Sequence, residues 1–262
     1  MRLAVTRYGA IQTGHSLPVI ILHGLFGSSR NWHPVAQSLA KGSKSSPVYA
    51  LDLRNHGKSP HSSIMNYPAM AQDIVEFMAA EHIGKARLIA HSMGGKVAMW
   101  LALTEPERVS KLVVVDIAPV AYEHDFSGVL EALKSVPIEH IGSRKEADHY
   151  LARYLAQQSL RQFLLQNLQL KDGHYQWRLN LDAITHSIAD ITGFPDTRNI
   201  QAYAKRVLFI GGDQSDYLNR ENQQKTRQLF PMATFSMIKN AGHWLHSEQP
   251  KIFMALINPY LN

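Results

Sequence analysis

The stretch that decides the fold is Arg87-Leu-Ile-Ala-His-Ser92-Met-Gly-Gly95, in which an apolar, β-rich run meets a serine and two glycines. From residue 96 to residue 103 the apolar positions follow helical spacing. A strand, a serine among small residues and then a helix predict a sharp turn that exposes the Ser92 hydroxyl. Ala90 replaces the usual first glycine, but one methyl is tolerable where Gly94 keeps strand and helix close. The motif is weak alone, and its setting makes Ser92 a strong candidate nucleophile.

Outward from this turn, short apolar runs rich in β-branched residues alternate with helical patterns. This alternation predicts an α/β fold, with a mostly parallel twisted sheet flanked by helices on both faces. An opening edge strand is expected at residues 3–7. The other expected strands are 19–22, 48–53, 87–90, 112–115, 207–210 and 234–238. The expected helices are 32–39, 67–78, 96–103 and 251–261.

Between residues 119 and 200 the alternation stops. Apolar residues there keep helical spacing, as Leu160, Phe163, Leu164 and Leu168 do. A block of this length is far more than a simple crossover between parallel strands needs. We therefore expect a core formed by residues 1–118 and 201–262. A purely helical cap, residues 119–200, is expected to sit over one edge of the sheet and close the site.

The composition fits one globular domain of 262 residues, 45% of them hydrophobic, without low-complexity tracts. The absence of cysteine excludes disulfides, cysteine-bound metals and a thiol nucleophile. No apolar run is long enough for a membrane span, and the first residues lack a signal-peptide core, so we expect a cytoplasmic enzyme.

The charge pattern gives no reason to expect a nucleic-acid partner. The chain has 27 Lys and Arg against 21 Asp and Glu, a net charge of +6, but the basic residues are scattered and form no nucleic-acid module. We interpret this surplus of positive charge first as a general positive bias of a soluble protein surface. The alternative is that it attracts an anionic substrate such as an acyl-CoA.

Reactive residue types stand where the expected strands end. The carboxyl ends of parallel strands meet at one rim of a sheet, which is where ligands bind in open α/β sheets. The residues placed there, in chain order, are His23, Asp52, Ser92, Asp116, Asp213, Asp216 and His243. The sequence therefore predicts that residues from most of the chain converge on one site.

His243 is the best candidate for the base that activates Ser92. A serine hydroxyl is a poor nucleophile until a neighbouring base takes its proton. His243 lies in Asn240-Ala-Gly-His-Trp244, just after the last expected strand, and it completes the chain order serine, aspartate, histidine. The nearby His246 is interpreted as a supporting or surface residue.

Two backbone N–H groups are candidates for an oxyanion hole. His23-Gly-Leu-Phe-Gly27 directly follows the first buried strand, and a glycine-containing turn there can point an N–H at the rim. Together with the N–H of Met93 it gives the two donors that a developing oxyanion needs. The first donor is expected to be Leu25, with Phe26 as the alternative.

Six segments carry a wider resemblance: His23-Gly-Leu-Phe-Gly-Ser28, Asp52-Leu-Arg-Asn-His-Gly-Lys-Ser59, Met65-Asn-Tyr-Pro-Ala-Met-Ala-Gln-Asp73, Ala90-His-Ser-Met-Gly-Gly-Lys96, Val115-Asp-Ile-Ala-Pro-Val120 and Ala241-Gly-His-Trp-Leu-His246. Together they resemble the α/β-hydrolase superfamily over essentially the whole chain, and most of all the small YbfF-type bacterial esterases and their mitochondrial abhydrolase relatives. The resemblance implies hydrolysis of small-molecule esters or acyl thioesters through a Ser-His-Asp triad, with no metal or organic cofactor.

The acid of the triad has more than one candidate. In most of the superfamily it follows the strand expected here at residues 207–210, which nominates Asp216 or Asp213. In the subfamily that the chain resembles, it ends the preceding strand, which nominates Asp116. We favour Asp116, then Asp216, then Asp213. Asp52 and Arg54 are expected to form a structural loop contact.

Several alternatives stay open. A cofactor-free perhydrolase or carbon–carbon bond hydrolase would use the same triad, and a non-catalytic ligand-binding homologue would share the fold. A dehalogenase or epoxide hydrolase would need a carboxylate in place of Ser92. Metal hydrolysis at His243 and His246 lacks an HExxH motif. His186 and Asp190 have an acyltransferase-like spacing without further support.

Overall fold

A seven-stranded sheet forms the centre of the structure, a computed structural model that describes residues 1–9, 17–41 and 46–261. The strand order is β1 (Val5–Tyr8), β3 (Val48–Leu51), β2 (Val19–Leu22), β4 (Ala86–His91), β5 (Val109–Val115), β8 (Val207–Gly212) and β9 (Ala233–Ile238). β1 pairs antiparallel with β3, and all the other neighbouring strands are parallel. The predicted α/β architecture with a mostly parallel sheet is confirmed, and the expected edge strand is present and runs antiparallel to its neighbour.

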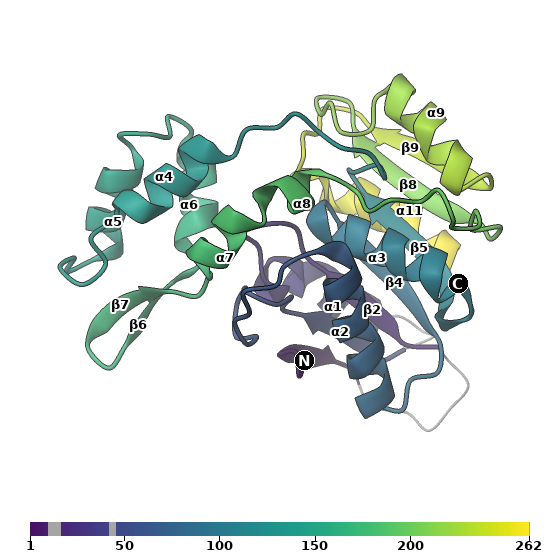
Figure 1. Cartoon of the computed structure of the whole chain (residues 1–262), viewed down its shortest axis with the longest axis horizontal. Coiled ribbons are helices and arrows are strands. Elements are labelled where there is room, and N and C mark those ends of the chain that lie inside the picture. Colours follow the sequence, from purple (N-terminus) through teal and green to yellow (C-terminus); the bar gives the residue numbers. More distant parts are fainter. Residues whose placement is uncertain (10–16, 42–45, 262) are drawn as a thin grey trace.

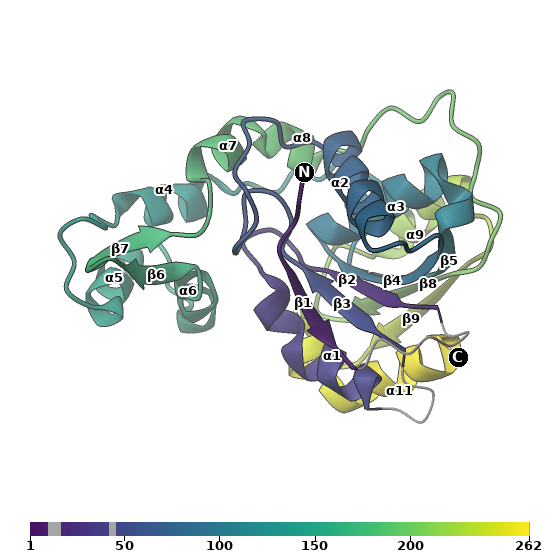
Figure 2. The same ribbon diagram turned by 90° about the horizontal axis from the view of Figure 1, so that it is seen from below.

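Helices cover both faces of this sheet (Figures 1 and 2). α2 (Tyr67–Ala80) and α3 (Met93–Thr104) lie on one face, and α1 (His33–Ala40) and α11 (Pro250–Leu261) lie on the other. The shorter or more peripheral helices are η1 (Ser29–Trp32), η2 (Pro106–Arg108), α9 (Arg220–Leu229) and α10 (Leu245–Glu248).

The side chains of the central strands feed two hydrophobic clusters in alternation. In β2, Ile20 and Leu22 belong to the cluster under α2 and α3, whereas Val19 and Ile21 belong to the cluster under α1 and α11. Because a parallel strand with helices on both sides buries every residue, such strands are apolar throughout rather than at every second position. This burial explains why continuous apolar runs in the sequence marked the strands.

The segment between β5 and β8, residues 119–200, is called the inserted segment below. Figure 1 shows it extending to one side of the sheet. Its elements are α4 (Ser127–Ser135), α5 (Arg144–Leu151), α6 (Gln158–Leu165), β6 (Leu168–Lys171), β7 (His174–Trp177), α7 (Leu181–His186) and α8 (Ile188–Thr192). The prediction that this segment is purely helical is wrong, because β6 and β7 form an antiparallel hairpin.

Local turn chemistry accounts for this hairpin. Asp172 and Gly173 connect its two strands with positive φ angles of 51° and 83°. An Asp-Gly pair with positive φ at both residues is the favoured two-residue turn between antiparallel strands. Leu168 fits the helical spacing of α6, but that helix ends at Leu165 and Leu168 begins β6 instead.

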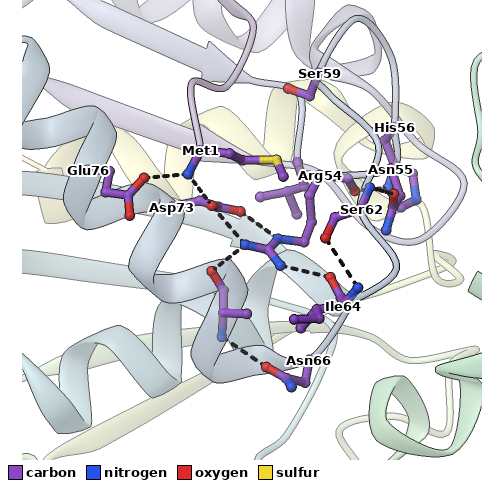
Figure 3. Close-up of polar contacts among 12 residues, drawn as sticks. Met1, Arg54, Asn55, His56, Ser59, Ser62, Ile64, Asn66, Asp73 and Glu76 are labelled. Atoms are coloured by element: carbon purple, nitrogen blue, oxygen red, sulfur yellow. Dashed lines mark hydrogen bonds and ion pairs between the residues drawn. The ribbon is translucent and has the colours of Figure 1, made fainter. Parts of the chain in front are cut away.

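The loop after β3 is held by buried polar contacts (Figure 3). The Arg54 guanidinium donates to both carboxylate oxygens of Asp73 on α2, at 2.7 and 2.9 Å. The Asp52 carboxylate accepts the N–H groups of Ser29 and Lys58, at 2.7 and 2.9 Å. These contacts agree with the structural role expected for Asp52 and Arg54.

Within the described ranges, no helix combines the length and the apolar character that a membrane crossing requires.

Candidate active site

Ser92 lies in the sharp turn between β4 and α3. Its backbone has a positive φ of 52° with ψ of −123°, a conformation that non-glycine residues rarely adopt and that costs free energy. The Ser92 N–H donates to the carbonyl of Val115, 3.0 Å away, which fixes the turn to the neighbouring strand. A Cβ on Gly94 would lie 2.5 Å from the carbonyl oxygen of His23. The close approach predicted from the glycine pattern is therefore present.

A continuous hydrogen-bonded chain runs from Ser92 through His243 to Asp116. Ser92 Oγ lies 3.0 Å from His243 Nε2, and His243 Nδ1 lies 2.7 Å from Asp116 Oδ2. Asp116 is fully buried. Its carboxylate also accepts the N–H of Gly212, at 3.1 Å, and the hydroxyl of Ser215. The structure therefore brings the favoured serine, histidine and aspartate together.

The two alternative acids are placed elsewhere. Asp213 and Asp216 are both exposed. In the part of the chain that the structure describes, Asp116 is the carboxylate that pairs with His243, and neither of the alternatives contacts the imidazole. Asp213 instead accepts the N–H of Ala241, at 3.3 Å, two residues before His243. The loop after β8 thus supports the Asp116 carboxylate and the loop of His243 instead of supplying the acid.

The turn after β2 distinguishes the two candidate oxyanion donors. The carbonyl of Gly24 accepts His23 Nδ1–H at 2.8 Å and the N–H of Gly27 at 3.0 Å. Because the C=O and N–H of a planar trans peptide point in opposite directions, these bonds also fix the direction of the Leu25 N–H. The N–H of Phe26 already donates to His56 Nε2, at 3.2 Å. Leu25 thus fits the role better than Phe26.

His56 is a residue that the sequence analysis did not identify. Its Nδ1–H donates to the carbonyl of Arg54, 2.9 Å away, while its Nε2 accepts from Phe26. One donor and one acceptor nitrogen define a neutral imidazole. Complete burial lowers the pKa of His56 to about 3, which agrees with this neutral form. His56 lies within the segment from Asp52 to Ser59 that carries the family resemblance. No feature of that segment indicated that His56 would contact the turn after β2.

His243 is packed on two sides by rings. Tyr217 stacks on its imidazole with ring centroids 4.3 Å apart, a contact that the sequence did not predict. His91 Nε2 donates to the backbone carbonyl of His243, at 2.9 Å, and burial lowers the pKa of His91 well below its usual value. His246 is buried and stacks on Trp32 at 4.1 Å. Of the two roles predicted for His246, support beneath the site is the one that the structure shows.

Two pockets meet at Ser92. The large pocket has a volume of about 420 Å³, and its apolar walls include Leu25, Phe126, Leu160, Phe163 and Trp244. The small pocket has a volume of about 30 Å³. Its walls include Met93, Tyr122, Ile191 and Thr192. The inserted segment contributes to both pockets.

The comparison with known protein families agrees with this geometry. The model of the alpha/beta hydrolase fold family matches residues 18–250. The chain belongs to this α/β-hydrolase family. The family predicted from the six sequence segments is therefore confirmed.

Similar proteins of this α/β-hydrolase family carry the names of esterases and lipases. The chain is 41% identical to the sn-1-specific diacylglycerol lipase ABHD11 of Danio rerio over 256 residues, which are 95% of this chain and 79% of that protein. It is 36% identical to the esterase YbfF of Escherichia coli (strain K12) over 265 residues, the full length of both. A solved structure named as a marine microorganism esterase superposes with a TM-score of 0.92 at 37% identity, covering 99% of each chain. These relatives agree with a carboxylic ester hydrolase.

The remaining candidates of this α/β hydrolase lie away from Ser92. His186 and Asp190 are both exposed. His186 Nδ1 bonds to the carbonyl of Asp182 within its own helix, at 2.7 Å. Over the described ranges, no cluster of three or more potential metal-binding side chains is found.

Proposed function

We propose that this α/β hydrolase cleaves neutral carboxylic esters through a covalent acyl-enzyme on Ser92. The observation that carries the proposal is the chain of hydrogen bonds from Ser92 through His243 to buried Asp116, which opens onto the apolar large pocket. A strained, partly exposed serine beside an oriented imidazole is the arrangement that activates a hydroxyl for acyl transfer.

The mechanism follows from the positions of these groups. His243 Nε2 takes the proton of Ser92 as Oγ attacks the ester carbonyl, and the N–H groups of Leu25 and Met93 hold the oxyanion. The protonated imidazole then gives its proton to the departing alcohol, leaving the acyl group on Ser92. Water repeats the sequence and releases the acid. Asp116 keeps Nδ1 protonated and stabilises the imidazolium.

The large pocket favours a neutral substrate over an acyl-CoA. None of the side chains that the structure places along its walls is a lysine or an arginine, and one of them is the acidic Asp125. The phosphates of coenzyme A are bound most strongly by guanidinium and ammonium groups, which these walls do not offer. The lysines and arginines that the structure describes therefore do not line this pocket, although the chain has a net charge of +6. An apolar ester gains the hydrophobic contact without a desolvation cost for phosphates.

The inserted segment acts as a cap in this proposal, over a core formed by residues 1–118 and 201–262. Phe126, Leu160 and Phe163 come from this segment and form much of the apolar wall. The buried side chain of Asn167 donates to the carbonyl of Phe26, at 2.7 Å, so the segment also holds the oxyanion turn. A cap of this kind shapes the pocket and limits the access of water.

S-ethyl thioacetate and acetyl-CoA are thioesters of the same acid, and only the second is anionic. Comparing their turnover therefore distinguishes a preference for neutral substrates from a preference for anionic ones. We expect hydrolysis of p-nitrophenyl acetate well above the background of the Ser92→Ala variant. S-ethyl thioacetate should have a kcat/KM at least about 100-fold above that of acetyl-CoA, because the phosphates find no cationic partner. Equal or faster turnover of acetyl-CoA would overturn the proposed substrate class. If the protein hydrolysed none of these three compounds, the proposed function would be overturned.

A further inference from the structure

The two pockets border different parts of the catalytic machinery. His243 lines the large pocket, whereas Met93 lines the small pocket. Leu25 and Ser92 line both. Of these groups, the base therefore borders only the large pocket, Met93 borders only the small pocket, and Leu25 lies where the two pockets meet.

This division fixes where the two halves of an ester lie, provided that the proposed function holds. In the tetrahedral intermediate the oxyanion points at Leu25 and Met93, and the departing oxygen must lie beside His243 Nε2 to receive its proton. The alcohol part then extends into the large pocket. The small pocket, which borders Ser92 and Met93 but not His243, is then left for the remaining substituent of the reacting carbon, which is the acyl chain.

The small pocket leaves little room for an acyl chain. Its volume of about 30 Å³ accommodates about two water-sized groups. One side of it is formed where the inserted segment joins the core, at two places that we call the two connections. Tyr122 lies on the first connection, which follows β5, and Ile191 and Thr192 lie at the second, where α8 ends. The size of the pocket thus depends on how these two connections are held.

A buried lysine holds both connections. Lys96 on α3 is 1% exposed, and its ammonium donates to the carbonyls of Val120, at 2.7 Å, Thr192, at 2.8 Å, and Gly193. Within the described residues it forms no ion pair with a carboxylate. Its three N–H donors match three carbonyl acceptors, which is how a charge in such a position can be satisfied.

The same contacts tie the connections to the helix of the nucleophile. Lys96 lies one turn after Ser92 on α3, and α8 ends beside this turn (Figure 1). The Tyr122 N–H also donates to the Thr192 carbonyl, at 3.0 Å, and the Tyr122 ring lies 4.8 Å from the Lys96 ammonium. The wall of the small pocket is thereby fixed relative to Ser92.

We propose that the small pocket receives the acyl group, so that the substrates are short-chain acyl esters of larger apolar alcohols, and that Lys96 is the positioning residue that keeps this pocket small. This inference rests on the proposed esterase function. It assigns the specificity for the acid part to the connections and the specificity for the alcohol part to the large pocket.

Isomeric esters test the assignment of the pockets. Hexyl acetate and ethyl hexanoate have the same formula and similar intrinsic reactivity, and they differ in which half is long. The wild-type protein should hydrolyse hexyl acetate with a kcat/KM at least about tenfold higher, because each methylene that a pocket rejects costs about tenfold or more. A preference for ethyl hexanoate would overturn the assignment. So would turnover of p-nitrophenyl acetate without turnover of hexyl acetate. Loss of turnover with all three esters would instead refute the proposed esterase function.

Three variants test the wall of the small pocket. Lys96→Met keeps an unbranched side chain but cannot donate to the three carbonyls, so it should raise kcat/KM for ethyl hexanoate relative to hexyl acetate. Ile191→Ala should raise kcat/KM for ethyl hexanoate directly. Leu160→Ala, the matched truncation in the large pocket, should not. Rates are divided by the active-site concentration from fluorophosphonate titration, which removes losses due to misfolding.

The ratio of the two isomers distinguishes specificity from stability. If Lys96→Met retains titratable sites and an unchanged ratio, its positioning role is refuted. If Lys96→Met fails to fold, Ile191→Ala still decides whether the acyl group occupies the small pocket, and an unchanged kcat/KM for ethyl hexanoate there would refute the proposal.

Discussion

Replacing Ser92 by alanine should lower kcat for ester hydrolysis by about 10⁵- to 10⁶-fold, because the attacking oxygen is lost together with the covalent pathway. The remaining side chains around Ser92 are unaffected by removal of one hydroxyl, so circular dichroism and thermal unfolding should change little. Steady-state hydrolysis of p-nitrophenyl acetate provides the measurement.

The partner of Ser92 gives the matched control for this prediction. His243→Ala should lose a similar factor, since an unactivated hydroxyl is nearly inert. The double variant should lose little more than either single variant, because the two side chains act as one unit. Full additivity of the two losses, or more than about 1% residual activity in Ser92→Ala, would show that another residue carries the reaction.

Asp116→Asn should lower kcat by about 10⁴-fold while leaving the geometry of the site largely intact. The amide cannot stabilise the imidazolium, and it disfavours the tautomer in which His243 Nε2 is free to accept the Ser92 proton. The effect should be large because Asp116 is fully buried and lies 2.7 Å from His243 Nδ1.

Asp213→Asn and Asp216→Asn are the matched controls, since both residues are exposed and neither contacts His243. Each should keep kcat within about threefold of wild type, the range of a surface change that leaves the site in place. Collapse of activity in Asp216→Asn, with Asp116→Asn active, would move the acid to the loop after β8. Comparable activity in all three variants would exclude an aspartate as the acid.

The sequence was most informative where a continuous run of apolar residues indicated that a strand is buried. The apolar runs of β2 and β5 are continuous because helices cover both faces of the sheet, so these strands could be predicted without homologues. Ser92 and His243 could then be predicted to meet, because each follows a parallel strand and the ends of such strands share one rim.

The choice of the triad acid could not be made from local sequence patterns. Asp116, Asp213 and Asp216 all follow strands, so position along the chain could not rank them and a family resemblance had to do so. What distinguishes Asp116 in the structure is its burial and its direction, since Asp116 directly follows β5 with a positive φ of 51° and its carboxylate bonds to His243 Nδ1. These features depend on the packing of neighbouring strands.

The features that the sequence analysis missed involve contacts between distant segments. Lys96 reads as one polar residue of an apolar helix, and its carbonyl partners lie 24 to 97 residues away along the chain. Tyr217 lies in a loop whose sequence gives no sign of a ring stacked on His243. The hairpin of β6 and β7 is a different case, since its Asp-Gly turn was a local signal that helical spacing outweighed.

The central claim, that His243 activates Ser92 as the nucleophile, is tested most directly by covalent labelling. A fluorophosphonate should form one adduct, and mass spectrometry of the digested protein should locate it on the peptide that contains Ser92. The adduct should be absent from Ser92→Ala and should form far more slowly in His243→Ala. An adduct on another residue of the wild-type protein, or labelling that persists in Ser92→Ala, would contradict the account.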